Sequence, residues 1–133
     1  MKKNKNIVYV GMSADILHPG HINILKTASK YGNVYVGLLT NKAIMTYKRK
    51  PLMNYLERKI VLSQMKMIYK IIPQRTLDYS FNLKLLKPKY VIHGNDWKKG
   101  AQSKARKRVL ELPVLPHFSK ILLLKKQRDS WTF

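Results

Sequence analysis

Two histidines stand close together near the start of the chain, in the segment His18-Pro19-Gly20-His21. An apolar run at residues 7–10 precedes them, and residues 22–29 follow with helical spacing of apolar side chains, so the pair is predicted at a strand-to-helix junction. The start of a helix attracts anions, because its N–H groups and the positive end of its dipole point outward there. The two imidazoles could therefore hold a phosphate group and stabilise the charge that builds up when a phosphoryl centre reacts.

The sequence leaves two other uses of this pair open. One histidine could cap the helix while the other packs against the protein, or the pair could bind a metal ion as neighbours at positions i and i+3. A metal site lacks a convincing third ligand, because the chain has no cysteine and only 6 Asp and Glu residues. We therefore assign no metal ligand. Between the histidines, Gly20 leaves the backbone free of a side chain where an anion would approach most closely.

The rest of the chain alternates between short apolar runs and segments with helical spacing. The pattern predicts strands at residues 7–10, 34–40, 69–72 and 90–92, and helices at 22–29, 41–44, 55–67, between 78 and 87, and at 102–112. This alternation is typical of βαβ units, so we expect an α/β fold: a single Rossmann-like domain over residues 1–112, with a parallel sheet flanked by helices. Residues 113–133 form a divergent basic tail, for which a final strand, a basic amphipathic segment and a poorly ordered end all stay open.

Three connecting segments follow predicted strands and would share one edge of the sheet, where parallel α/β sheets bind ligands. The first contains the histidines, the second carries Lys48 with basic neighbours, and the third covers residues 93–97. Lys48 could clamp a phosphate, although a run of charges is more often a solvated surface. Arg58 falls in the first turns of a predicted helix, where the helix dipole disfavours a positive charge. Its position there indicates an anion nearby. Asp96 could bind Mg²⁺ or a ribose hydroxyl, and Trp97 could stack on a base or close the core.

The chain is strongly basic. It has 27 Lys and Arg against 6 Asp and Glu, a formal net charge of +21 over 133 residues. Such a field concentrates anions, whether nucleic acid, an acidic membrane or phosphate-bearing metabolites, but much of the excess is scattered lysine. The apolar run that follows the basic residues 1–6 is too short for a secretory signal or a membrane span. We expect a cytoplasmic protein without a membrane partner.

Three motifs in this order resemble one known family. The segment His18-Pro19-Gly20-His21 after a strand, residues 55–59 (Tyr-Leu-Glu-Arg-Lys) and residues 93–97 (His-Gly-Asn-Asp-Trp) are similar to successive motifs of the cytidylyltransferase-like nucleotidyltransferases, whose hallmark is HxGH. Within that family the chain is most similar to the glycerol-3-phosphate cytidylyltransferase type. Residues 8–15 and 102–104 look most like the phosphonate cytidylyltransferases linked to phosphoenolpyruvate mutase.

The resemblance implies a direct transfer of CMP from CTP to a small phosphate or phosphonate, with release of pyrophosphate, with Mg²⁺ and without a covalent intermediate. By motif, the catalytic residues would be His18, His21 and Lys48. The remaining motif residues would form the nucleotide pocket, namely Met12, Ser13, Ala14, Gly20, Arg58, Asn95, Asp96 and Trp97. The resemblance also implies a homodimer.

Two features depart from the pattern of the family. Asn95 stands where these enzymes commonly carry an acid, which softens a polar contact without removing it. The family's C-terminal Ile-Ser-Ser-Thr motif has no counterpart after Leu112, so we expect a truncated or frame-shifted tail with impaired catalysis. The alternative function is a non-catalytic protein that binds nucleotides or nucleic acid through its positive charge.

Overall fold

The computed structural model describes residues 6–94 and 120–124. Strands and helices alternate along the chain as the apolar pattern predicts. The strands are β1 (Ile7–Met12), β2 (Asn33–Leu39), β3 (Ile68–Gln74), β4 (Tyr90–Gly94) and β5 (Lys120–Leu124). The helices of the described residues are α1 (Pro19–Ser29), α2 (Asn41–Met45), α3 (Tyr55–Ser63) and α4 (Ser80–Leu86).

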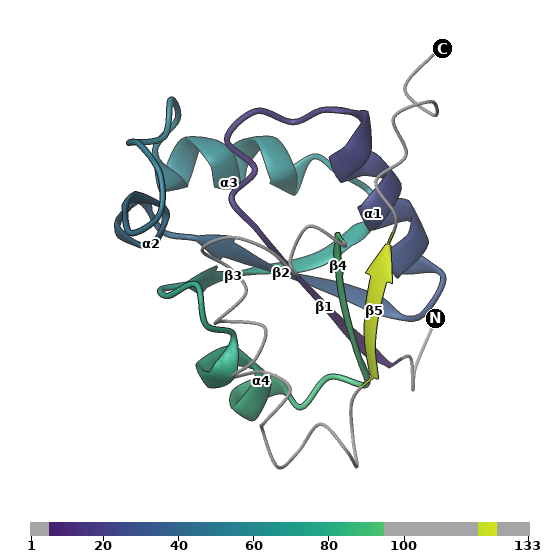
Figure 1. Cartoon of the computed structure of the whole chain (residues 1–133). Coiled ribbons are helices and arrows are strands. Elements are labelled where there is room, and N and C mark those ends of the chain that lie inside the picture. Colours follow the sequence, from purple (N-terminus) through teal and green to yellow (C-terminus); the bar gives the residue numbers. More distant parts are fainter. Residues whose placement is uncertain (1–5, 95–119, 125–133) are drawn as a thin grey trace.

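The five described strands form one parallel sheet in the order β3-β2-β1-β4-β5 (Figure 1). β1 lies in the middle, where Val8 is opposite Val34 of β2 on one side and Tyr90 of β4 on the other. The chain first winds outward from β1 to β3 and then returns to the other side of β1. The strand order thus reverses between β1 and β4, and such sheets bind ligands at the carboxyl ends of the strands at that point.

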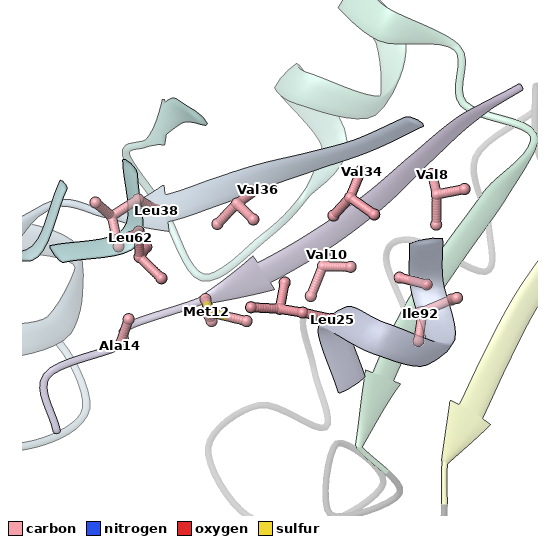
Figure 2. Packing of buried hydrophobic residues seen from close by; sticks show 11 residues of the cluster. Val8, Val10, Met12, Ala14, Leu25, Val34, Val36, Leu38, Leu62 and Ile92 are labelled. Atoms are coloured by element: carbon pink, nitrogen blue, oxygen red, sulfur yellow. The ribbon is translucent and has the colours of Figure 1, made fainter. Parts of the chain in front are cut away.

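Helices α1 and α3 cover one face of the sheet, where the larger apolar cluster lies (Figures 1 and 2). Alternate residues of β1 contribute to it, since successive side chains of a strand point to opposite faces. Figure 2 shows Val8, Val10 and Met12 of β1 on the side where Leu25 of α1 packs. Leu25 has no exposed surface. The apolar face of α1 therefore fixes this helix on the sheet, and with it the histidines at its start.

Helix α4 covers the opposite face, where a glycine makes room for a tyrosine ring. A Cβ at Gly37 of β2 would lie 1.7 Å from the hydroxyl oxygen of Tyr9, which is fully buried. This hydroxyl donates to the side-chain oxygen of Gln74 at the end of β3 and accepts from the amide of Asn82 on α4. Burial raises the pKa of Tyr9 well above its ordinary value, so the hydroxyl stays protonated. The network joins α4 to the carboxyl edge of the sheet.

Several predicted boundaries differ from the structure. The helix predicted over residues 55–67 ends at Ser63, because the chain turns at Gln64 to enter β3. The strand predicted to stop before Pro73 continues through it to the next residue; a proline is tolerated because β3 is an edge strand of the described sheet. β1 runs on to Met12 instead of ending at residue 10. The tail contributes strand β5, one of its three open alternatives, and the helix predicted over residues 102–112 lies outside the described residues.

The architecture confirms the predicted α/β class, a parallel sheet flanked by helices. The helices are short, and α1 has 11 residues. Within the described ranges, none of them has the length and apolar character needed to cross a lipid bilayer. Their function in this fold is to cover the sheet and to present their ends at its carboxyl edge.

Candidate active site

The histidine pair lies at the carboxyl edge of the sheet, beside the point where the strand order reverses. β1 ends at Met12, and a short connection leads to the start of α1 at Pro19. The first turn of α1 contains no acidic residue, so no negative side chain in that turn offsets the positive end of the helix dipole. The predicted strand-to-helix junction at the histidines is confirmed.

His18 and His21 close the start of α1 by bonding to the backbone. His18 is the N-cap, and its Nδ1 accepts a hydrogen bond from the N–H of Gly20 at 3.0 Å. His21 accepts from the N–H of His18 at 3.2 Å through its own Nδ1. This arrangement is a capping box in which histidines take both side-chain roles. The ring centroids lie 4.2 Å apart. The capping role that the sequence left open is therefore present, and it fixes both rings.

These hydrogen bonds determine which ring nitrogen carries the proton. An imidazole nitrogen that accepts from an N–H is unprotonated, so the neutral form of each ring has its proton on Nε2. Burial, together with the nearby charges of His18 and Lys48, lowers the pKa of His21 to about 4. At neutral pH, His21 is therefore an uncharged ring with a donor at Nε2. Such a donor can bind a phosphate oxygen without a change in its own protonation.

The backbone N–H groups at this end of α1 are largely used within the protein. Pro19 has none, the N–H of Gly20 bonds to the ring of His18, and the N–H of His21 bonds to the carbonyl oxygen of His18 at 2.9 Å. The expectation that free N–H groups of the helix terminus would face the anion is therefore wrong at these two positions. The imidazole Nε2 groups and the helix dipole are the features that attract an anion here.

Residues 12–14 turn the chain from β1 toward α1. The side chains of Met12 and Ala14 lie in the core, 8% and 2% exposed, so these residues can offer a ligand little besides their backbone. Ala14 has a φ of 51°, a left-handed conformation that is uncommon for residues other than glycine. The Lys48 ammonium lies 3.5 Å from the hydroxyl oxygen of Ser13. The structure thus brings Lys48 to the loop between β1 and α1, as expected for segments that share one edge of the sheet.

One charged residue of this loop was missed among the predicted site residues. Asp15 accepts from the N–H of Leu52 and from the N–H of Met53, one through each carboxylate oxygen and both at 3.0 Å. Burial alone would raise the pKa of the Asp15 carboxyl, but the two N–H donors and the charges of Lys48 and Arg58 lower it below its ordinary value. Asp15 is therefore ionised at neutral pH. The one available signal was an acid so close to the histidines in a chain with few acids.

Arg58 is fully buried, and its guanidinium bonds to four protein oxygens. It donates to the carbonyl oxygens of Met53 at 2.9 Å, Ser13 at 2.8 Å and Leu39 at 2.7 Å, and to the side-chain oxygen of Asn41 at 2.7 Å. These oxygens belong to the loop after β1, the last residue of β2, the first residue of α2 and the loop before α3. The residue that the dipole argument placed near an anion thus binds uncharged oxygens of the protein. A contact between Arg58 and a nucleotide stays a prediction.

The third predicted segment is described only at its first two residues, His93 and Gly94, which end β4. Asn95, Asp96 and Trp97 lie outside the described residues, and their roles stay predictions. Within the described ranges, no group of three or more histidine, cysteine or carboxylate side chains could hold a metal ion. The described part of the site is therefore a set of imidazole and ammonium donors at a helix start.

A comparison with known families matches residues 9–128 of the chain to the model described as cytidylyltransferase-like. The match contains the histidine pair, Lys48 and Arg58. The chain belongs to the cytidylyltransferase-like family. The resemblance that three motifs indicated is confirmed at this level, and the HxGH motif of the family forms the histidine capping box of α1.

Two curated relatives in this family carry different names. The FAD synthase of Methanopyrus kandleri is 33% identical over 93 residues, which cover 67% of this chain and 62% of the relative. The bifunctional protein HldE of Aliarcobacter butzleri is 31% identical over 97 residues, which cover 70% of this chain and 20% of the relative. The chain thus spans less than two thirds of either relative. Neither name specifies a glycerol-3-phosphate or phosphonate cytidylyltransferase.

Solved structures share the fold of this cytidylyltransferase-like chain. A lipopolysaccharide core biosynthesis protein from Thermoplasma volcanium has a TM-score of 0.76 and 23% identity, with 93% of this chain and 99% of that chain covered. A pantoate-beta-alanine ligase from Francisella tularensis has a TM-score of 0.63 and 18% identity, with 97% of this chain and 62% of that chain covered. At such identities the likeness shows the fold alone.

Proposed function

We propose that this member of the cytidylyltransferase-like family transfers a nucleotidyl group from a nucleoside triphosphate to a small phosphate or phosphonate and releases pyrophosphate. One observation carries the proposal. The Nδ1 atoms of His18 and His21 both accept backbone N–H groups, so both rings have their donor at Nε2 beside the positive end of α1. Two oriented imidazole donors and a helix dipole at one point suit an anion that gains charge during a reaction.

The proposed reaction is a single displacement at phosphorus. An oxygen of the acceptor's phosphate or phosphonate attacks the α-phosphorus of the triphosphate. The bond from the α-phosphorus to the oxygen that bridges it to the β-phosphate breaks, and pyrophosphate leaves with that oxygen and its electron pair. No bond to the protein forms, which fits a site whose described side chains are donors rather than nucleophiles.

The residues would act by binding and by electrostatics. His18 and His21 would donate from Nε2 to phosphate oxygens, and a donor whose orientation its capping bond already fixes needs no rearrangement as charge develops. Lys48, held near Ser13, would add a positive charge on the acceptor or triphosphate side. Mg²⁺ would enter as part of the nucleotide substrate, bound mainly to phosphate oxygens and water, where it offsets their charge.

The base of the nucleotide is the open part of the proposal. The three motifs favour CMP transfer from CTP. The FAD synthase of Methanopyrus kandleri is named for a product that contains AMP, so a relative with that name favours ATP. We propose CTP with a phosphate or phosphonate acceptor as the first choice, and ATP as the direct competitor in the same assay.

The test separates the chemistry of the histidines from their capping role. In His18→Asn the side chain is still one of the best N-caps, and in His21→Gln it can still complete a capping box, but both variants lack an imidazole Nε2 donor. We expect thermal unfolding close to that of the unaltered protein, together with a loss of pyrophosphate release of at least about 100-fold. Release is measured with Mg²⁺ and CTP or ATP against a panel of small phosphates and phosphonates.

Two outcomes would overturn the proposal. Pyrophosphate release that is unaffected in folded His18→Asn and His21→Gln would remove the histidines from the reaction. Absence of release with every nucleotide, combined with tight and steeply salt-dependent nucleic-acid binding, would favour a non-catalytic polyanion-binding protein, because counterion release makes such binding strongly dependent on salt.

A further inference from the structure

The loop between α2 and α3 is tied to the loop between β1 and α1 by a closed ring of hydrogen bonds. The peptide groups around Met53 are bound on both sides: its N–H donates to Asp15 at 3.0 Å, and its carbonyl oxygen accepts from Arg58 Nε at 2.9 Å. The Arg58 guanidinium also donates to the carbonyl oxygen of Ser13, in the loop between β1 and α1, at 2.8 Å. Ser13 and Asp15 flank Ala14, which completes the ring. We name Asp15, Met53, Arg58 and Ser13 the clasp.

The backbone of Ala14 is shaped to serve this ring. Its φ of 51° is a left-handed conformation, which costs an alanine about 1 kcal/mol relative to its ordinary conformations. This left-handed conformation of Ala14 lets the carbonyl oxygen of Ser13 accept from Arg58. The Asp15 carboxylate, two residues after Ser13, then accepts from the N–H groups of Leu52 and Met53. Uncommon backbone conformations persist where the surrounding structure holds them in place, and the clasp does so here.

The second loop carries Lys48 and is held at two points. At one end, the N–H of Lys48 bonds to the carbonyl oxygen of Ile44 in α2 at 3.1 Å. At the other end, Asp15 holds the N–H groups of Leu52 and Met53. Between these two points, the Lys48 ammonium reaches the hydroxyl of Ser13. The position of this charge relative to the histidines therefore depends on the clasp.

We propose that Asp15 and Arg58 are positioning residues, which hold Lys48 at the histidine site without touching the substrate. The clasp itself is a property of the fold; its effect on catalysis rests on the function proposed above. Asp15 has both oxygens occupied by backbone N–H groups, and Arg58 has no exposed surface, so each works through the loop. A long, flexible lysine gains most from such support, because ordering its side chain costs rotamer entropy.

The first experiment tests the clasp without reference to activity. Hydrogen exchange of the Leu52 and Met53 amides is measured by NMR in the unaltered chain, in Asp15→Ala and in the milder Asp15→Asn. We expect protection of both amides in the unaltered chain and a loss of at least about tenfold in Asp15→Ala, with the amides of β1 still protected, which shows that the fold is intact. Unprotected Leu52 and Met53 amides in the unaltered chain would overturn the clasp.

A matched variant controls for the loss of one negative charge. Asp78 also accepts hydrogen bonds through its carboxylate, from the N–H and the hydroxyl of Ser80. Asp78→Asn therefore removes the same charge from a carboxylate with a local bonding role before α4. We expect it to leave the Leu52 and Met53 amides protected. Equal loss of protection in Asp78→Asn and Asp15→Asn would mean that net charge, and not the clasp, determines exchange.

The second experiment tests the coupling to Lys48 with a double-mutant cycle of Asp15→Asn and Lys48→Gln. The readouts are kcat and KM for the nucleotide, and the Kd for inorganic pyrophosphate. Alone, Asp15→Asn should lower kcat/KM about tenfold; in the Lys48→Gln background it should cost less than about twofold, because the residue that it positions is gone. Additive effects would overturn the positioning role. If the unaltered chain is inactive, the proposed function is contradicted instead. The exchange data and the double-mutant cycle for pyrophosphate binding would still test the clasp.

Discussion

Each histidine at the start of α1 combines two roles in one side chain. Nδ1 of His18 and of His21 stabilises the helix by accepting a backbone N–H, and the same bond leaves the proton on Nε2. An alanine substitution therefore removes a helix cap and an imidazole donor together, and a loss of activity in such a variant would have two causes. Asparagine at the cap and glutamine in the box separate them, because both keep an acceptor and neither has an imidazole.

At the residue scale, the lowered pKa of His21 predicts that the folded protein loses stability in mild acid. Its pKa is about 4 in the folded protein, because of burial and then the charges of His18 and Lys48, and about 6.5 in an unfolded chain. Between these values the unfolded state binds more protons, so stability must fall as the pH falls from about 6.5 to 4. With allowance for partial exposure of the ring, we expect about 1 kcal/mol at pH 5, a few degrees in Tm.

The matched variant for this prediction is His21→Gln, whose side chain does not titrate. Thermal unfolding of both proteins is followed from pH 7 to pH 4.5, and the difference in Tm between them is compared across the range. The unaltered protein should lose stability relative to His21→Gln as the pH falls. Parallel curves would show that His21 has the same pKa in the folded and unfolded chains.

At the scale of the element, the C-terminus of α4 contains a backbone conformation that its residue does not favour. Lys87 has φ 48° and ψ 57°, the left-handed cap geometry that glycine adopts most readily. Lys87→Gly should therefore stabilise the protein by about 0.5–1 kcal/mol, measured by denaturant unfolding. Lys84→Gly, inside the same helix, removes the same charge and should destabilise by about 1 kcal/mol. Destabilisation by both variants would contradict the strain argument.

The sequence predicts the elements well where periodicity and capping agree. Asn54, a residue type that favours the N-cap, directly precedes the helical spacing, and its side-chain oxygen accepts from the N–H of Glu57 at 2.9 Å. The end of α3 was placed too late, because Met65 continues the helical spacing and no glycine or proline marks the turn at Gln64. The strand at Pro73 was cut short, since the local rule for proline does not reveal that β3 lies at an edge.

The candidate site was predictable only where it is local in sequence. The histidine pair and its helix start can be read from a few adjacent residues. The clasp cannot, because Asp15 meets Leu52 and Met53 across 37 and 38 positions, and these partners contribute only backbone N–H groups that every sequence has. For the same reason the sequence did not reveal the partners of Arg58, because three of its four described partners are backbone carbonyl oxygens.

At the scale of the whole molecule, the net charge of +21 should limit stability at low salt. Like charges repel in the compact state, and salt screens them over about 10 Å at 0.1 M. We expect Tm to rise between about 20 and 200 mM sodium chloride. Exposed lysines on and after α3 offer a control: a variant with Lys59→Gln, Lys66→Gln and Lys70→Gln should respond less to salt. A Tm that is independent of salt would show that the charges are already well separated.

The position of β1 in the middle of the sheet has a consequence for the nascent chain. β1 is synthesised before the other described strands, and Val8 can pair early with Val34, but its other neighbour begins only at Tyr90. Until the ribosome has released β4, this largely buried central strand has one unpaired edge, which is a template for wrong pairing with another copy. The net positive charge, which opposes the compact folded state, would make nascent copies repel one another until β4 has paired with β1. It would thereby reduce wrong pairing between copies during synthesis.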